Sequence, residues 1–305
     1  MVIFLLFVFI CIIFKINAKH INNSFNKNLT ITKKNVILGV ILNYDWKIIA
    51  PFFISFKKAR FNNCDCVMFV ENLTQETINK MESYNVTIIK IQRTIKALII
   101  NYRHKLYEDF LRNNADKYNL VLSIDVRDSF FQKDIFKYYE NISKSFLSFA
   151  LEDDYLSKKI NKAWIINAFG YNVFNAIKHE RIICGGTVLG SLDKIMEFSS
   201  IIWKIMNQSD DSRENWIDQA VINYIIYYKK FIRNENKDSP FLTLAASKPE
   251  SFIIDSEGNI LNIKGEIPAV IHQYDRHKKC VIKVMKKYSK NSNEENSDNN
   301  NNYIF

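Results

Sequence analysis

Two aspartates follow an apolar run in the middle of the chain, within Val-Leu-Ser-Ile-Asp-Val-Arg-Asp-Ser-Phe-Phe-Gln at residues 121–132. An apolar run without alternation is typical of a strand buried on both faces, as in a parallel α/β sheet. Ligands of such sheets bind beyond the carboxyl ends of the strands, where Asp125 and Asp128 would lie. Their position makes these two carboxylates candidates for binding a ligand or a metal ion.

A third candidate is His272, which stands on a late predicted strand. The hard cations Mn²⁺ and Mg²⁺ prefer oxygen ligands, and Mn²⁺ also accepts an imidazole. Alternate residues of a strand share a face, so Arg127 would take the place of a second ligand unless the chain turns after Asp125. With that turn, Asp125, Asp128 and His272 would form a metal site. The alternative is that the acids form surface ion pairs or cap the next helix, and that His272 is a core histidine.

Strands and helices alternate along most of the chain. Apolar runs predict strands at residues 36–42, 66–70, 86–91, 120–124, 146–151 and 181–189. Helical patterns predict helices at residues 48–59, 74–84, 99–113, 164–178, 191–206 and 216–228. This alternation predicts βαβ units and therefore one α/β domain over residues 35–288, with a mostly parallel central sheet flanked by helices. Pro51 is expected in the first turn of its helix, where proline is tolerated.

Glycines bear on how the chain could hold a ligand. No Gly-x-Gly-x-x-Gly or Gly-x-x-x-x-Gly-Lys-Ser/Thr sequence occurs, so neither of these phosphate-binding loops is available. The pair Gly185-Gly186 interrupts a predicted strand, which marks either a bulge or a close approach of the backbone to a ligand. Asp218 opens a predicted helix, where an acid also suits the helix dipole.

The first residues predict entry into the secretory pathway. Residues 2–14 are apolar but fall short of the ~20 residues that span a bilayer, which favours a cleaved signal peptide at residues 1–18 and no stable membrane span. A short signal-anchor is the alternative. A polar lead follows at residues 19–34, and the Asn-rich residues 289–305 predict a disordered tail. In an oxidising lumen, Cys184 and Cys280 would form a bridge or remain buried thiols.

Charge and acceptor sequences add to this picture. The 305-residue chain carries a formal charge of +10, but its Lys and Arg are spread out and no nucleic-acid-binding motif accompanies them, so we expect no nucleic-acid partner. Asn-x-Ser/Thr sequences are glycosylation acceptors in the secretory pathway. They begin at Asn22, Asn28, Asn72, Asn85, Asn141 and Asn207.

The order of the motifs resembles that of GT-A-fold glycosyltransferases, which use nucleotide-sugar donors. The resemblance covers residues 36 to about 277. It rests on Asn43-Tyr44 at a strand exit, Arg103 before the acids, Asp125-Val126-Arg127-Asp128 as the Asp-x-Asp element, Cys184 to Gly190 as the donor-sugar segment, Asp218-Gln219 at a helix start and His272 as the late metal ligand. The acidic element is one residue longer than Asp-x-Asp, and the Gly-x-x-Lys-Pro-Trp tail of retaining relatives is absent.

The resemblance implies transfer of a hexose from a nucleoside-diphosphate sugar, expected to be UDP-linked, to a glycan or glycoprotein acceptor. Mn²⁺ or Mg²⁺ would be held by Asp125, Asp128 and His272. Arg276 and Lys278 would supply the positive charge of the missing tail. An inverting enzyme would need a general base, expected among Glu152-Asp153-Asp154, which are predicted to form a solvated turn, or at Asp218. The implied catalytic residues are Asp218 and Gln219, and the implied donor-binding residues are Asn43, Tyr44, Arg103, Asp125, Gly185, Gly186 and Asp218.

Two other functions fit the same pattern. One is a non-catalytic secreted protein of this fold that binds glycans or nucleotide-sugars. The other is a nucleotidyltransferase, which is disfavoured because Asn43-Tyr44-Asp45-Trp46 is not the Gly-rich loop that usually follows the first strand in such enzymes.

Overall fold

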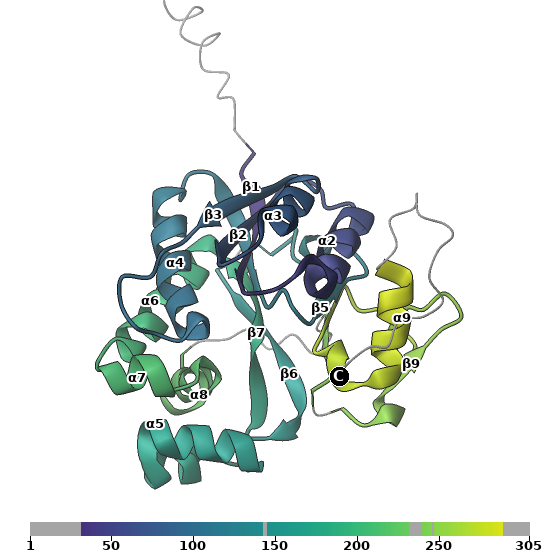
Figure 1. Ribbon diagram of the computed structural model, residues 1–305. Coiled ribbons are helices and arrows are strands. Elements are labelled where there is room, and N and C mark those ends of the chain that lie inside the picture. Colours follow the sequence, from purple (N-terminus) through teal and green to yellow (C-terminus); the bar gives the residue numbers. More distant parts are fainter. Residues whose placement is uncertain (1–31, 143–144, 232–239, 246, 289–305) are drawn as a thin grey trace, which may run out of the picture. The chain divides into compact units, whose positions relative to one another are not determined.

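A central sheet of six strands, in the order β3-β2-β1-β4-β7-β6, organises the computed structural model (Figure 1). The structure describes residues 32–142, 145–231, 240–245 and 247–288, and Lys34 begins the compact α/β unit that contains the sheet. The strands of this sheet are β1 (Lys34–Leu42), β2 (Cys64–Glu71), β3 (Val86–Lys90), β4 (Tyr118–Ile124), β6 (Leu147–Tyr155) and β7 (Arg181–Ser191).

The predicted α/β class is confirmed, but the sheet is mixed. The strands β3, β2, β1 and β4 pair in parallel, whereas β7 runs antiparallel to both β4 and β6. The direction of β7 was beyond the sequence pattern, because a strand buried on both faces has the same apolar run whichever way it points. The reversal brings the middle of β7 beside the carboxyl end of β4, where Thr187 pairs with Ile124.

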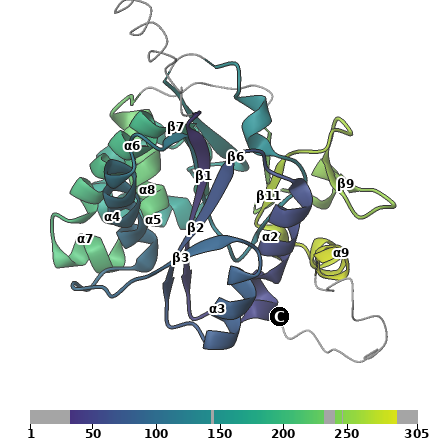
Figure 2. The ribbon, with the colours of Figure 1, turned by 90° about the horizontal axis from the view of Figure 1, so that it is seen from above.

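Helices cover both faces of the sheet, as predicted (Figure 2). Successive residues of a strand point to opposite faces of the sheet. In β1, the side chain of Ile37 lies in the apolar cluster on the face covered by α2 and α3, whereas that of Val36 lies in the cluster on the face covered by α4 and α6. The helices are α2 (Trp46–Ala59), α3 (Gln75–Glu82), α4 (Ile99–Asn113), α5 (Lys159–Ile177), α6 (Leu192–Met206), α7 (Asp210–Asn215), α8 (Asp218–Asn223) and α9 (Lys278–Tyr288). Short 3₁₀ turns are η1 (Ile135–Tyr138), η3 (Pro249–Ser251) and η4 (Tyr274–Arg276), and η2 (Tyr224–Tyr228) is a π-helix that continues α8.

A second, smaller sheet brings the C-terminal part of the unit to the end of β4. Its order is β5-β11-β8, formed by Ser129–Phe131, Val270–His272 and Phe241–Thr243. The strand β11 is antiparallel to β5, with His272 opposite Ser129. Residues 255–259 join the two strands of an antiparallel hairpin, β9 (Phe252–Ile254) and β10 (Ile260–Asn262). The pairing of β11 with β5 therefore holds His272 beside the segment that contains Asp125 and Asp128.

Three local predictions were wrong. Pro51 lies beyond the first turn of α2, because the helix already begins at Trp46, and proline cannot donate the backbone hydrogen bond expected there. The acids Glu152-Asp153-Asp154 belong to β6 and do not form a turn, since β6 continues to Tyr155 beside β7. The helix predicted from residue 216 begins at Asp218 and changes to π-helical geometry at Tyr224.

The ends of the chain and the cysteines complete the comparison. The predicted signal peptide, nearly all of the polar lead and the C-terminal tail lie outside the described residues. Within the part of the chain that the structure describes, no helix has the length and apolar character needed to cross a membrane. Cys184 and Cys280 are both buried free thiols, so of the two alternatives for this pair the structure has the thiols.

Candidate metal centre

The chain turns after Asp125, as a shared site with Asp128 requires. The strand β4 ends at Ile124, a turn spans residues 126–128, and β5 starts at Ser129. The turn is held on two sides, because Asp125 N donates to the carbonyl of Gly186 at 2.8 Å and Gln273 N donates to the carbonyl of Asp128 at 2.7 Å. The turn brings the two carboxylates together, and Arg127 donates a hydrogen bond to Oδ2 of Asp128.

Asp125, Asp128 and His272 form one cluster of possible metal ligands. One ligand atom from each residue lies within 4.8 Å of the others. The Nε2 atom of His272 is 3.4 Å from Oδ1 of Asp128 and 3.7 Å from Oδ2 of Asp125. The side chains of His272 and Asp128 are 2% and 5% exposed, whereas that of Asp125 is 36% exposed.

The Nε2 atom of His272 is the ligand atom of the cluster whose hydrogen bonding is incomplete. It makes no hydrogen bond to any described residue, although it is shielded from solvent. A buried polar atom left without a partner is costly, so such atoms usually have one in the functional state. Two carboxylates and an imidazole are a suitable donor set for a divalent cation such as Mn²⁺. The cluster could therefore hold a metal ion.

The charges in the cluster are strongly coupled. Burial by itself would raise the pKa of Asp125, but the Arg103 guanidinium and the His272 ring hold that pKa well below its usual range. Burial would lower the pKa of His272, but the Cys184 sulfur and the Asp125 and Asp128 carboxylates raise it well above its ordinary value. In the described structure Asp125 and His272 stabilise each other in their charged forms.

Gly185-Gly186 gives the cluster its space. A Cβ atom added to Gly186 would lie 2.3 Å from Cε1 of His272 and 2.6 Å from Oδ2 of Asp125, which real structures do not allow. A Cβ atom at Gly185 would be looser, with Cδ1 of Ile222 at 3.2 Å. The pairing of β7 with β6 shifts register between Ile183 and Val188, so the glycine pair lies in an irregular stretch of the strand, as the bulge alternative expected. The groups that approach Gly186 there are the side chains of His272 and Asp125.

Arg103 connects the cluster to a second acid. It projects from α4, is 2% exposed, and donates from Nη1 to Oδ1 of Asp125 at 2.5 Å. Its Nη2 donates to Oδ2 of Asp218 at 2.5 Å and to the carbonyl of Gly185 at 2.9 Å. Burial by itself would lower the pKa of Arg103, but the neighbouring carboxylates of Asp218 and Asp125 raise that pKa above its usual value. Arg103 lies inside the protein as a brace between elements, and its partners are protein atoms.

Asp218 and Gln219 lie together at the start of α8, next to the glycine pair. The Oδ2 atom of Asp218 accepts from Arg103 and lies 3.2 Å from Nε2 of His104. Gln219 accepts from Gly185 N at 3.1 Å through Oε1, and its Nε2 donates to Oε1 of Glu152 at 3.2 Å. The same amide nitrogen also donates to Oδ1 of Asn161 at 3.1 Å. These two residues therefore join α4, β6, α5 and β7 at one point.

Three further residues take part in this arrangement. Glu152 was expected as a possible general base and Cys184 as part of the donor-sugar segment, whereas His104 was not singled out. Glu152 is 5% exposed on β6, and burial raises its pKa. His104 is buried beside Arg103, and burial lowers its pKa. Cys184 places its Sγ atom 3.2 Å from Nδ1 of His272. For His104, the available signal in the sequence was its position next to Arg103.

The strand exit of β1 also reaches this region. Tyr44 is half-buried, and its pKa is raised by burial and by Asp128 and Asp125, although Arg127 acts in the opposite direction. Its neighbour Asn43 is exposed and has a left-handed backbone conformation (φ = 56°). The structure thus places Tyr44 in the electrostatic neighbourhood of the acids, whereas the side chain of Asn43 faces solvent.

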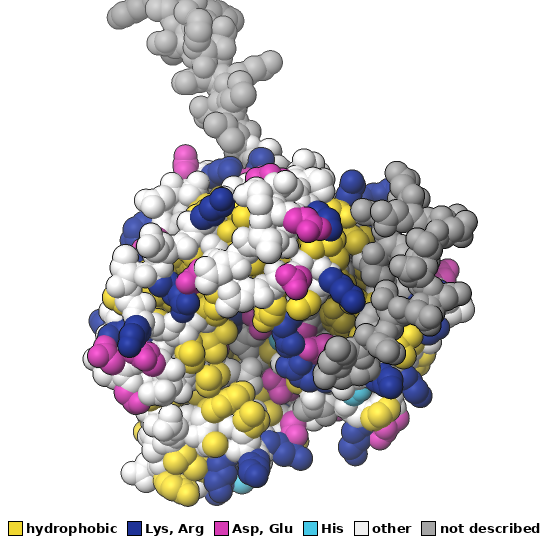
Figure 3. Space-filling view, in the orientation of Figure 1, with side chains coloured by type: hydrophobic (Ala, Val, Ile, Leu, Met, Phe, Trp, Pro, Cys, Tyr) yellow, Lys and Arg dark blue, Asp and Glu magenta, His cyan; other side chains and the backbone are white. Residues whose placement is uncertain are grey.

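Positive charge lies on the outer side of Asp128. Arg127 donates to Oδ2 of Asp128 at 2.7 Å and pairs with Asp275 at 2.9 Å. Nη2 of Arg276 is 3.8 Å from Oδ2 of Asp128, and that side chain is 43% exposed. Lys278 is exposed at the start of α9. Figure 3 shows a hollow near the centre of the face it presents, with basic and acidic side chains along one wall.

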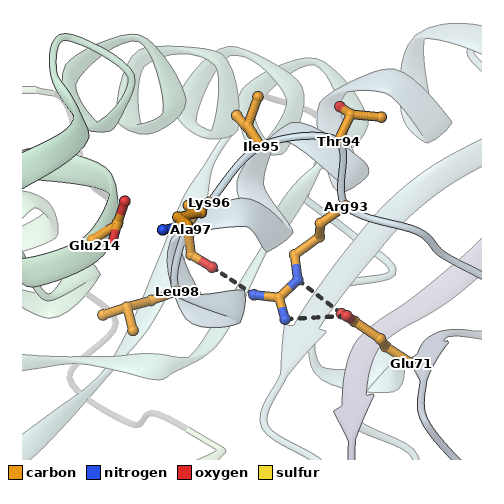
Figure 4. A pocket seen from close by; sticks show the side chains of 8 residues that line it. All are labelled: Glu71, Arg93, Thr94, Ile95, Lys96, Ala97, Leu98 and Glu214. Carbon is orange, nitrogen blue, oxygen red and sulfur yellow. Dashed lines mark hydrogen bonds and ion pairs between the residues drawn. The ribbon is translucent and has the colours of Figure 1, made fainter.

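A separate pocket of about 460 Å³ lies beyond the end of β2 (Figure 4). Arg93 crosses it, with Nε 2.8 Å from Oε2 of Glu71 and Nη1 donating to the carbonyl of Ala97 at 2.5 Å. Its lining is formed by Glu71, Arg93, Thr94, Ile95, Lys96, Ala97, Leu98 and Glu214. None of Asp125, Asp128 and His272 lines this pocket, so the metal-ligand cluster is a distinct site.

Comparison with known proteins leaves the family open. No protein-family model matches the chain, and no similar sequence was found among curated proteins. Site and fold therefore carry the functional argument.

Proposed function

We propose that the protein is a metal-dependent glycosyltransferase of the GT-A type, which moves a hexose from a UDP-sugar to a glycan or glycoprotein acceptor. The observation that carries the proposal is the cluster of Asp125, Asp128 and His272, in which the buried Nε2 of His272 faces both carboxylates and makes no hydrogen bond to a described residue. The order of motifs and the α/β sheet whose strand β4 leads directly into the acids support it.

Asp125, Asp128 and His272 would hold Mn²⁺. When bound, the cation supplies positive charge that neutralises the diphosphate leaving group. Arg276 is partly exposed beside Asp128 and is suited to bind the outer phosphate oxygens in place of the missing tail. Tyr44, half-buried and within the electrostatic influence of the same acids, would contact the nucleotide. Arg103 has a supporting role in the proposal, because its guanidinium is already engaged by Asp125, Asp218 and Gly185.

Of the two candidates for a general base, Glu152 fits better than Asp218. The Oδ2 atom of Asp218 accepts a hydrogen bond from Arg103 and also lies 3.2 Å from Nε2 of His104, so this carboxylate is already engaged. Glu152 is held by Gln219 through Oε1, and burial raises the pKa of Glu152 toward the range in which a carboxylate accepts a proton effectively. In an inverting reaction Glu152 would remove the proton of the acceptor hydroxyl.

The secretory lumen is the proposed compartment. The support is the apolar run at residues 2–14, followed by a small residue at Ala18.

Turnover of UDP-hexose in the presence of Mn²⁺ tests the proposed activity. We expect hydrolysis or transfer with Mn²⁺, and loss of turnover in Asp128→Asn. The matched control is Asp109→Asn, an exposed acid on α4 that pairs only with Lys105 among described residues. Equal turnover in Asp128→Asn and in the control would exclude Asp128 from the mechanism. Mn²⁺-independent binding of UDP without turnover would point instead to a non-catalytic binding protein.

A further inference from the structure

The free thiol of Cys184 lies against the metal-facing histidine, on the opposite side of its ring. Cys184 is 1% exposed in β7, directly before the glycine pair, and its Sγ atom is 3.2 Å from Nδ1 of His272. The other ring nitrogen, Nε2, faces Asp128 and Asp125 and has no hydrogen bond to a described residue. The two nitrogens of His272 therefore have different environments, one a sulfur and the other the space between two carboxylates.

We infer that Cys184 is a positioning residue for the metal centre, which accepts a hydrogen bond from Nδ1–H of His272 and so presents the lone pair of Nε2 to the cation. The inference rests on the proposed function, because it assumes that His272 is a ligand. A neutral imidazole carries one ring proton, and only the nitrogen without it can bind a metal. With Sγ as the acceptor at Nδ1, the proton stays on Nδ1 and Nε2 is free to ligate.

The surroundings of the ring leave few other groups for this task. On one side, Gly186 lies so close that even a Cβ atom would meet Cε1 of His272. The backbone of His272 is fixed by β5 and β8 on either side of β11. The ring is thus held in place by backbone, and Cys184 selects which nitrogen carries the proton. Partners of this kind are usually carboxylates, carbonyls or water, and their loss typically weakens metal binding by about 10- to 100-fold.

Titration of the full-length protein with Mn²⁺, followed by electron paramagnetic resonance of the free ion, tests the inference. We expect Cys184→Ala to bind Mn²⁺ about 10- to 100-fold more weakly than the unmodified protein. Cys184→Ser restores an acceptor and should recover most of the affinity. Cys280→Ala is the matched control, since it removes another fully buried free thiol, which lies on α9 and packs in a separate apolar cluster with Ile54 and Phe130. Thermal unfolding in a chelator shows whether each variant is folded.

A purely packing role makes a different prediction. Cys184→Ser, with a polar group in an apolar setting, would then be no better than Cys184→Ala, and that result overturns the inference. Equal affinity of Cys184→Ala and Cys280→Ala also overturns it, while loss of Mn²⁺ binding in Asp128→Asn would still support the proposed metal site. Absence of Mn²⁺ binding by the unmodified protein would refute both.

A second measurement needs only the native cysteine. Nitrogen-15 spectra of histidine-labelled protein loaded with diamagnetic Zn²⁺, with the His272 signals identified by their loss in His272→Gln, should show the metal on Nε2 and the proton on Nδ1. A metal on Nδ1 would overturn the inference even if a cysteine variant failed to fold.

Discussion

Nε2 of His272 lies 3.4 Å from Oδ1 of Asp128, although the two residues are far apart in the sequence. The contact follows from strand pairing, because β11 ends at His272 and is antiparallel to β5, which begins immediately after Asp128. The smaller sheet therefore completes a cluster that the end of β4 begins. The candidate metal site depends on the fold as a whole, and its parts can be tested separately.

Arg103→Met should destabilise the protein by about 3–5 kcal/mol, because it leaves the buried Asp218 and the partly buried Asp125 without their shared guanidinium. Urea unfolding measures the change. The control is Arg112→Met on the same helix, whose ion pair with Glu108 leaves the arginine 63% exposed and should matter by no more than about 0.5 kcal/mol. Similar losses in the two variants would show that Arg103 is not a buried brace.

Gly186→Ala should abolish Mn²⁺ binding and cost about 1–3 kcal/mol of stability, because the added Cβ atom forces His272 and Asp125 apart. Gly185→Ala is the neighbouring control, with its closest contact at 3.2 Å to a flexible isoleucine side chain. Calorimetric titration with Mn²⁺ separates the two. If Gly186→Ala bound the ion as well as Gly185→Ala did, the cluster would have a different arrangement.

The stability of the sheet should depend on the charge of Asp65 at acidic pH. Burial alone would raise the pKa of Asp65, but hydrogen bonds from Lys117, Lys34 and Tyr118 lower it. A carboxyl group whose pKa is lowered by folding adds stability above its unfolded pKa of about 3.9, and that stability is lost as the pH falls through the folded value.

Asp65→Asn checks this sign directly. The free energy of unfolding should be lower in Asp65→Asn than in the unmodified protein at pH 7, and the difference should shrink as the pH falls below about 4. Chemical denaturation at a series of pH values measures it. A difference that stays constant with pH would mean that the carboxylate charge contributes nothing.

The sequence predicted most elements, because their local signals are strong. The helix expected at residues 99–113 has those bounds in α4, whose buried residues recur on one face. The direction of β7 escaped prediction, since the apolar run of a doubly buried strand is alike in both directions. The strand position of Glu152 in β6 was also not predicted, because a glutamate next to two aspartates is typical of the surface. Its contact with the amide of Gln219 is formed only by the tertiary fold.

The site was predictable in outline and not in its contacts. Asp125, Asp128 and His272 were identified from position and from the order of motifs, and the structure brings them together. Arg103 stands in a run with His104 and Lys105 that resembles a solvated helix face, and only tertiary packing shows that Arg103 and His104 are buried. The contact between Cys184 and His272 joins two strands of different sheets, which no local pattern encodes.

Binding of UDP with and without Mn²⁺ tests the central claim most directly. Isothermal titration of the unmodified protein should show that Mn²⁺ tightens UDP binding by about tenfold or more, equivalent to roughly 1.4 kcal/mol. The gain should disappear in Asp128→Asn and remain in Asp109→Asn. UDP binding of the same strength with and without Mn²⁺, unchanged in Asp128→Asn, would contradict a metal-dependent nucleotide-sugar site at Asp125, Asp128 and His272.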